Sequence, residues 1–524
     1  MNFSQIDFLE TGMFSKLFLD YFQDEQVALK WANYTPDLKG LENKIRKRSF
    51  DVHTRKVLVE ALKNQYIKID TPNEVITNIA LLKKENTFTV TCGHQLNIFT
   101  GPLYFIYKIV STIKLAELLN QKFPEFNFVP IYWMATEDHD FEEINHFNLF
   151  GKTYKWDLNT SGAVGRIHTQ QMATFLDQLP IECKEWSDFY KNSETLAEAS
   201  QKLVTHLFGN SGLIVINPDD VSLRNLFKEY VKKEIIKRES IHHIEHTNNK
   251  LVNDGYKTQV HAREINLMYL SDNLRERIVF EDNLYKILNT NLVFTESEIL
   301  NLIDAHPENF STNVIMRPVY QETILPNIAF IGGPAEVVYW LQLKDLFSYF
   351  EVDMPVVLAR NFAMLINENQ HKKIEKLSIE YSDFFVDEQK IKQKLASQDF
   401  VLNFDNENIN LENLKTQYAQ KSNIIDQNLN GTVEAEFAKI QKQLHDLQKK
   451  VIKTAEKKST DKIEQFQNLK SKLFPDNSPQ ERFDNILNFI SNYPNVIENL
   501  FKVFHPLSNK YYIINLNKTD GTKK

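Results

Sequence analysis

Two short groups of polar residues could do chemistry in this sequence, and each directly follows an apolar run. The first group is Gly93-His94-Gln95, which comes after the run TFTV. A histidine can exchange a proton near neutral pH, and a glycine lets the backbone turn sharply or lie close to a ligand. We therefore expect a turn that begins at Gly93 and presents His94 and Gln95 to a substrate.

A helix is predicted to begin shortly after this turn. Thr100 is placed to cap the helix and Gly101 permits a tight entry, while Tyr104, Tyr107 and Lys108 would lie on its first turns. Free N–H groups and the helix dipole favour negative charge at a helix N-terminus, so we expect a phosphate or carboxylate to bind there. An ordinary capped helix would explain the cap but not the preceding glycine, histidine and glutamine. P-loop and dinucleotide-binding signatures are absent.

The second group follows the apolar run FNFVPIYWMA and consists of Thr136, Glu137, Asp138, His139 and Asp140. A carboxylate can hold an ammonium group or ribose hydroxyls, and a histidine beside carboxylates can act as a general base. The acids of the next segment, FEEINH, fit the solvated first turn of a helix. Histidines near these acids could hold zinc, but neither C-x-x-C nor H-E-x-x-H spacing occurs, so we expect no metal.

The glycine turn Gly332-Gly333 repeats the arrangement of the first group after a later apolar run. Glu336 and Trp340 would lie on the first turns of the helix that follows. The Trp340 ring fits core packing as well as a stacking surface for a ligand. Arg360 ends one further apolar run and could clamp an anion. These residues are candidates for substrate or nucleotide binding.

Alternating strands and helices must position these groups. A strand, a helix and a strand are predicted between residues 87 and 135, and the pattern recurs in GLIVINPDD with VSLRNLFKEYVKKEII and in NIAFIGGPAEVVYWLQLKDLF with MPVVLAR. This alternation predicts an α/β fold with a Rossmann-like parallel sheet, in which ligands bind beyond the carboxyl ends of the strands. The less regular residues 151–205 and 240–315 are candidate insertions.

The flanking regions have helical patterns. The first 85 residues or so are predicted to be helical. Apolar residues from Val433 to Val451 are spaced 4, 3, 4, 3 and 4, which is a heptad seam. We expect this seam to pair with a helix between Ile374 and Leu395 as a coiled-coil arm, and a helical layer on the core is the alternative. The tail contains YYIINL, a predicted strand, and then KTDGTKK, which we expect to be disordered.

These patterns predict five segments: N-terminal helices and the first half of the core (1–150), a further core unit with insertions (151–315), the last part of the core (316–366), the arm (367–475) and a helical and strand tail (476–524). The chain has 524 residues and a formal charge of −8, which argues against a nucleic-acid partner. A signal peptide and a membrane-spanning apolar run are not recognisable, so we expect a cytoplasmic protein without a membrane partner. Cys92 and Cys183 do not indicate a disulfide framework.

The blocks GHQLNIFTGPLYFIYK, PIYWMATEDHDFEEINH, GYKTQVHARE and MRPVYQETILPNIAFIGGPAEVVYWLQLK, with Arg360, resemble the bacillithiol-biosynthesis cysteine-adding enzymes, a family of cysteine ligases. The matching blocks lie between about Val90 and Arg360. The resemblance implies the last step of bacillithiol synthesis, in which the carboxyl group of L-cysteine joins the amine of glucosaminyl-malate. It also implies connecting-peptide insertions in the core, a coiled-coil arm and a homodimer.

This reaction has two chemical requirements. A carboxylate needs a better leaving group, which implies ATP or another nucleotide, and the attacking ammonium must lose a proton. The expected anion site near Gly101 and the acid and histidine group would serve these needs. The core is also similar to that of cysteinyl-tRNA synthetases, although their zinc-binding cysteines have no counterpart here. A nucleotide-binding coiled-coil scaffold, another ATP-dependent amide ligase and a nucleotidyl transferase are the alternatives.

Overall fold

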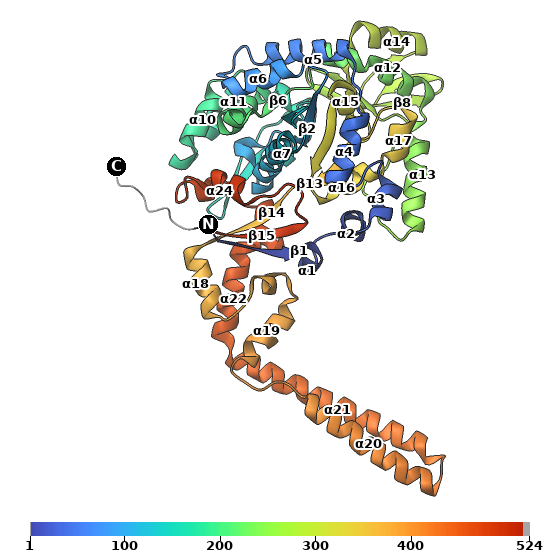
Figure 1. Ribbon diagram of the computed structural model, residues 1–524, viewed down its shortest axis with the longest axis vertical. Coiled ribbons are helices and arrows are strands. Elements are labelled where there is room, and N and C mark those ends of the chain that lie inside the picture. The colour runs from blue at the N-terminus through green and yellow to red at the C-terminus, as the bar shows by residue number, and fades with distance from the viewer. Residues whose placement is uncertain (1, 517–524) are drawn as a thin grey trace. The chain divides into compact units, whose positions relative to one another are not determined.

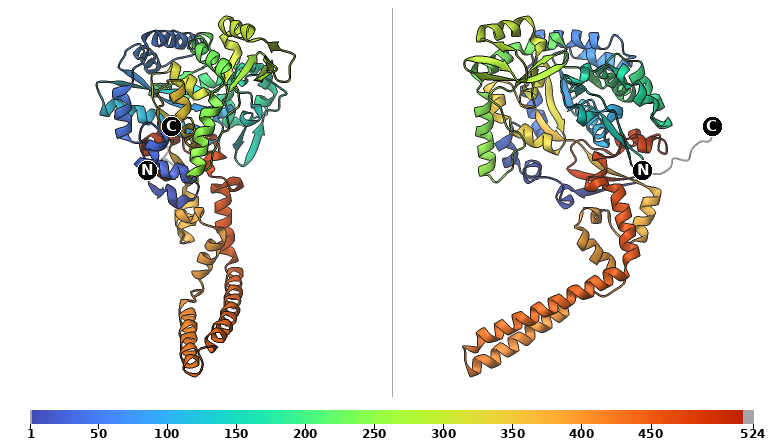
Figure 2. Two further views of the ribbon diagram at one scale, coloured as in Figure 1. Left: turned by 90° about the vertical axis from the view of Figure 1, so that its right-hand side faces the viewer. Right: turned by 180° about the vertical axis from the view of Figure 1, so that it is seen from behind.

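The computed structural model describes residues 2–516, so the tail KTDGTKK lies outside the described residues. The chain divides into two compact units, which Figures 1 and 2 show from three sides. The larger unit contains the residues up to Leu365 and those from Gln480 onward, and the smaller unit spans Ile366–Pro479. Within residues 2–516, no helix combines the length and the apolar character needed to cross a membrane.

A parallel sheet lies at the centre of the larger unit (Figure 1). Among the described residues it has five strands in the order β13-β12-β2-β3-β6, and every pairing is parallel. The strands are β2 (Thr87–His94), β3 (Asn127–Met134), β6 (Ile214–Ile216), β12 (Asn327–Gly332) and β13 (Val356–Ala359). The direction in which strands are added reverses between β2 and β12, so this is the topological switch point where ligands bind in such sheets. The predicted Rossmann-like core is confirmed.

Helices cover both faces of this sheet, which explains why its strands are buried along nearly their whole length. On one face lies α7 (Leu103–Lys122), whose Phe105 ring meets Tyr132 of β3 edge-on. On the other face lie α15 (Arg317–Ile324) and α16 (Pro334–Leu341). There Tyr320 contacts the ring of Trp133, the residue after Tyr132, because successive side chains of a strand point to opposite faces.

The N-terminal region is helical, as predicted: α2 (Lys16–Gln23), α3 (Glu25–Trp31), α4 (Leu38–Lys47), α5 (Val52–Gln65) and α6 (Asn73–Leu81). Before these helices comes a strand that was not predicted, β1 (Phe3–Asp7). It pairs antiparallel with β15 (Lys510–Leu516), which contains the predicted strand YYIINL, and β15 also pairs with β14 (Phe362–Asn367). The two ends of the described chain therefore meet in one small sheet.

The two less regular segments contain regular structure of their own. The first includes part of a hairpin, β4 (His146–Leu149) with β5 (Lys152–Lys155), and then α10 (Lys184–Lys191) and α11 (Leu196–Phe208). The second follows α12 (Val221–Lys237) and holds α13 (Ser240–Asn253), α14 (Glu296–Ala305) and an antiparallel sheet in the order β10-β9-β8-β7-β11. Its strands are β7 (Leu267–Ser271), β8 (Leu274–Glu281), β9 (Leu284–Ile287), β10 (Val293–Phe294) and β11 (Phe310–Thr312).

The smaller unit is helical and contains the predicted coiled coil, but the predicted pairing is wrong in detail. The seam lies in α21 (Leu429–Lys458), which runs beside α20 (Asp405–Ile425) in both views of Figure 2. The rings of Tyr418 and Phe437 contact each other at a tilt between these two helices, and Lys415 and Glu434 form an ion pair of 2.8 Å. The region expected to pair is instead broken into α18 (Glu368–Lys376), a 3-10 turn and α19 (Glu388–Ser397). A further helix, α22 (Thr460–Leu473), follows α21.

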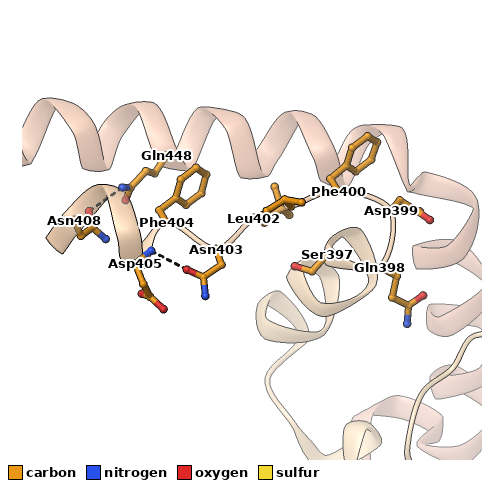
Figure 3. A pocket seen from close by; sticks show the side chains of 11 residues that line it. Ser397, Gln398, Asp399, Phe400, Leu402, Asn403, Phe404, Asp405, Asn408 and Gln448 are labelled. Carbon is orange, nitrogen blue, oxygen red and sulfur yellow. Dashed lines mark hydrogen bonds between the residues drawn. The ribbon is translucent and has the colours of Figure 1, made fainter. Parts of the chain in front are cut away.

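The link between α19 and α20 runs along α21 and borders a pocket of about 760 Å³ (Figure 3). The amide of Gln448 on α21 donates a hydrogen bond of 3.0 Å to Asn408 on α20 at one end of this pocket. The link itself exposes Phe400 and Val401. Both α19 and α20 contact α21, and α20 is its main partner along the seam.

Candidate functional site at the switch point of the sheet

A buried lysine joins the two strand ends at the switch point. Lys108 of α7 is 3% exposed, and its ammonium group donates to the carbonyl of Gly93 (2.8 Å) and to Glu336 of α16 (2.6 Å). The same Glu336 oxygen accepts a hydrogen bond from the backbone N–H of Gly333 (2.8 Å), directly after Gly332 at the end of β12. Burying a charge is costly unless it is paired and hydrogen-bonded. Here both conditions are met, so the pair ties β2 to the start of α16.

His94 ends β2 and is held neutral. Its ring lies 5.2 Å from the rings of both Tyr104 and Phe105, and its Nε2 atom has no hydrogen-bond partner among the described residues. Burial, together with the positive charges of Lys108 and Arg360, lowers the pKa of His94 well below its ordinary value. A neutral imidazole with a free nitrogen can donate or accept a hydrogen bond to a ligand.

Arg360 follows β13 and is 2% exposed. One of its terminal nitrogens donates to Glu481 (2.6 Å), which is 3% exposed at the side chain, and the other donates to the carbonyl of Asn361. Its Nε atom has no partner among the described residues and lies 3.9 Å from the place that a Cβ atom on Gly333 would occupy. Glu481 therefore neutralises the predicted anion clamp, and Arg360 keeps one buried donor beside the glycine turn.

Glu137 is a buried structural acid in this conformation. One carboxylate oxygen pairs with Arg224 of α12, and the other accepts a hydrogen bond from the Thr312 hydroxyl (3.0 Å). Arg224 also lies 3.4 Å from Asp219, so its charge is shared between two acids. Both oxygens of Glu137 have a partner in this structure, so a role in catalysis stays a prediction and would need one of these bonds to be shared or released.

Asp138 is the ionised acid of the second group. Burial raises its pKa, but hydrogen bonds from His139 and the nearby charge of Arg275 outweigh burial and lower the pKa to about 2. Arg275 lies 2.6 Å from Nδ1 of His139, to which its guanidinium can donate a hydrogen bond. Gln95 lies 3.4 Å from Asp138 and donates to Glu143 (2.6 Å), which brings the two sequence groups together.

Thr136 and Asp140 stabilise local structure. The Thr136 hydroxyl donates to Asn217 after β6 (2.6 Å), and Asp140 accepts the backbone N–H of Glu143 as the cap of the short helix α8 (Phe141–Ile144). The prediction that the following acids begin a helix is confirmed. Thr136 is thus engaged with the next strand, and Asp140 is an exposed helix cap.

The N-terminus of α7, where the sequence predicted an anion site, is partly covered by another segment of the chain. The Thr100 side chain does not cap the helix, because Pro102 occupies the cap position. Thr100 lies two residues earlier, in a left-handed conformation (φ 66°). The first helical N–H, that of Leu103, donates to the carbonyl of Asp484 (2.8 Å), and the Asn485 amide donates to two carbonyls of the preceding turn. A distant segment of the larger unit therefore covers this helix end, which the local sequence could not reveal.

Three further predicted binding residues have structural roles. Gly101 has a φ of 57°, and a Cβ atom there would lie 2.6 Å from the Cβ of Asn97, so the turn itself requires glycine. Trp340 is fully buried and stacks on Phe330 at 4.3 Å, as its core interpretation predicted. Tyr107 is also fully buried, and burial raises its pKa well above the ordinary value.

Sequence reasoning missed four charged residues at this edge: Arg224, Arg275, Arg317 and Glu481. Arg317 was part of a family block, but the other three come from separate elements and had no recognisable local pattern. Within residues 2–516, no group of three or more histidine, cysteine, aspartate or glutamate side chains is placed to hold a metal ion. The described site is thus a set of arginines and one lysine, most of them paired with acids, around the glycines of β2 and β12.

Two family models match the chain. They are described as "Bacillithiol biosynthesis BshC, N-terminal Rossmann-like domain", over residues 1–361, and "Bacillithiol biosynthesis BshC, C-terminal coiled-coil domain", over residues 363–516. A relative from Flavobacterium johnsoniae is 40% identical over 98% of this chain and 99% of its own length. Relatives from Flavobacterium psychrophilum (40% over 97% of this chain and 98% of its own) and Cytophaga hutchinsonii (38% over 96% and 97%) are similar. All three are named "Putative cysteine ligase BshC".

Proposed function

The chain belongs to the BshC family of bacillithiol biosynthesis, and from this premise we propose that the protein is a cytoplasmic ligase that joins the carboxyl group of L-cysteine to the amine of glucosaminyl-malate. The observation that carries the proposal is 40% identity, over 98% of the chain, to a relative named "Putative cysteine ligase BshC". The arrangement at the switch point supports it, because an amide-forming enzyme must hold anionic groups beside an amine.

The acid and histidine group would receive the amine. Asp138 is ionised at neutral pH, with a pKa of about 2, so it can bind a substrate ammonium group but cannot donate a proton. Gln95 connects Asp138 to the end of β2. We assign the ammonium of the acceptor to Asp138, within reach of the strand end that carries His94.

His94 is the candidate acceptor of the proton that the amine must lose. Its Nε2 atom is buried and without a described partner, and the charges of Lys108 and Arg360 add to burial in keeping the ring neutral. A bound anion would offset these two positive charges and raise the pKa of His94 toward a useful range. Substrate binding would thus prepare His94 to take the proton.

Activation of the carboxylate calls for ATP or another nucleotide, which would supply the leaving group when bound. The donors near Gly333 fit its phosphate groups: Arg360 has a buried Nε without a described partner, and Lys108 lies at the same turn. The start of α7 does not fit, because Asp484 and Asn485 cover it. These residues would position and neutralise phosphate oxygens.

The arm supports a homodimer as a further part of the proposal. Along the α21 seam, Ile440, Leu447 and Val451 are 39%, 55% and 41% exposed although they occupy heptad positions. Pairing with α20 therefore leaves part of the seam for a second copy of the chain.

The test is metabolite analysis of a strain from which this gene is deleted. We expect this strain to accumulate glucosaminyl-malate and to contain no bacillithiol. The wild-type gene should restore bacillithiol, and a gene with Asp138→Asn should not. Arg46→Gln, a change in an exposed arginine of α4, is the control and should restore bacillithiol. Unchanged thiol pools in the deletion strain would refute the proposal and favour a nucleotide-binding scaffold.

A further inference from the structure

One cation at the switch point is held only by neutral groups. Arg317, the first residue of α15, donates to the side-chain carbonyl of Gln321 (3.0 Å) and to the hydroxyl of Tyr339 (2.9 Å). Its guanidinium has five N–H groups, so these two bonds leave most of its donors without a partner among the described residues. Each of the other cations described at this edge has a carboxylate within 4 Å: Lys108, Arg224, Arg275 and Arg360.

The guanidinium lies over the end of β2. One terminal nitrogen is 3.4 Å from the place that a Cβ atom on Gly93 would occupy, and the group lies 5.6 Å and 5.7 Å from the ring centres of Phe330 and Trp340. The residue is half-buried between these elements. A charge that is partly removed from water and lacks a counterion is costly. An anionic ligand at Gly93 would supply the missing charge.

The surrounding structure holds Arg317 in place before any ligand binds. The Asn313 side chain accepts the backbone N–H groups of Ile315 (2.9 Å) and Met316 (3.2 Å), and its carbonyl accepts the N–H of Arg317 (2.9 Å). Tyr339 then braces the guanidinium from α16. A donor fixed in this way loses little conformational entropy when it binds a ligand.

A structural arginine of the same molecule shows a different arrangement. Arg55 is 1% exposed, and its guanidinium donates to three backbone carbonyls, those of Leu82, Glu85 and Thr87. These bonds hold α5 against the amino end of β2. Arg317 has no backbone carbonyl partner among the described residues and lies at the carboxyl end of the same strand, where ligands bind in sheets of this topology.

We propose that Arg317 binds an anionic group of a substrate, a carboxylate or a phosphate, directly beyond Gly93. Position 93 is then occupied by glycine because a side chain there would press on the guanidinium and its ligand. Tyr339, which binds Arg317, and Glu336, which binds Lys108, lie one turn apart on α16. This helix therefore places the two cations near each other. The anion site itself does not depend on the proposed function. Only the statement that its ligand is a substrate rests on that function.

The test is isothermal titration calorimetry with two probes, L-malate for the carboxylates of the acceptor and inorganic pyrophosphate for the phosphates of a nucleotide. Arg317→Gln should weaken binding of one probe about 10- to 100-fold, the range expected for lost hydrogen bonds to a charged group. Arg317→Lys should recover part of the loss, because lysine keeps the charge but not the two-pronged geometry. Circular dichroism of each variant verifies the fold, and Arg46→Gln is the control for loss of a positive charge.

The identity of the affected probe names the ligand. A loss confined to malate assigns Arg317 to the acceptor, and a loss confined to pyrophosphate assigns it to the nucleotide. Equal affinity of wild type and Arg317→Gln for both probes overturns the inference, as does a wild-type protein that binds neither. If Arg317→Gln loses affinity while the deletion strain keeps its thiol pools, the anion site stands and the proposed function fails. If the ligase is verified and both affinities are unchanged, the inference alone fails.

Gly93→Ala is a second and independent variant. Its Cβ atom would be 3.4 Å from the Arg317 guanidinium, in van der Waals contact with it, and would take up part of the space proposed for the ligand while Arg317 keeps its charge. We expect a smaller loss of affinity for the same probe that Arg317→Gln affects. A loss for the other probe alone would contradict a shared site.

Discussion

Removing the charge of Glu481 should destabilise the larger unit more than any surface substitution. Glu481 and Arg360 are 3% and 2% exposed at their side chains and lie 2.6 Å apart, and the second oxygen of Glu481 accepts the backbone N–H of Ala363 (3.0 Å). Glu481→Leu leaves a buried guanidinium without its counterion, at a cost of about 3–5 kcal/mol. The unpaired N–H of Ala363 adds about 1–3 kcal/mol. The loss is a large part of the ordinary stability of a protein, about 5–15 kcal/mol.

Urea denaturation followed by tryptophan fluorescence measures this effect, because Trp133, Trp340 and other tryptophans are buried in the larger unit. The double variant Arg360→Met/Glu481→Leu should recover much of the loss, since it removes both buried charges. The exposed pair of Arg46 and Glu42 is the control, and Glu42→Gln should change stability by less than about 1 kcal/mol. A Glu481→Leu variant as stable as this control would refute the reasoning, and so would a double variant less stable than Glu481→Leu.

Asp138→Asn should abolish bacillithiol formation with an unchanged circular dichroism spectrum, and retained thiol production would remove Asp138 from the site. The pKa of His94 is well below 6.5 in the folded protein, so the unfolded chain binds the extra proton first and stability should fall as pH drops below about 6.5. Urea midpoints at pH 5 and pH 8 should therefore differ less for His94→Gln than for wild type. Leu447→Glu on the exposed seam should shift the protein from dimer toward monomer in light scattering, and a monomeric wild type would refute the proposed dimer. Gly101→Ala should lower stability by about 1–3 kcal/mol, because φ is 57° and Asn97 lies too close, and an unchanged urea midpoint would contradict this.

Local patterns predicted the elements that have a repeating apolar period or a glycine turn. β2, β3, α7 and β12 lie where the sequence placed them, because apolar runs and breaker residues act over a few positions. The predicted partner of the heptad seam was wrong because the region around Ile374 has its own breaks, with Ser378 in a left-handed conformation (φ 50°). A period shows that a helix has an apolar side, but it does not identify the helix that covers it.

The anion site shows the limit of local reasoning most clearly. Thr100 and Gly101 have the residue types of a helix cap, and only the folded chain reveals that Asp484 occupies the first N–H of α7. In the same way, Gly93 was recognised as a special position, but its neighbour Arg317 lies more than two hundred residues away in the sequence. The sequence by itself thus determined the order of strands and helices in the parallel core and the family, since both are written in short blocks. The tertiary structure decided which charges are neutralised and which remain for a ligand, because strand order and chain crossings bring together residues that no local period connects.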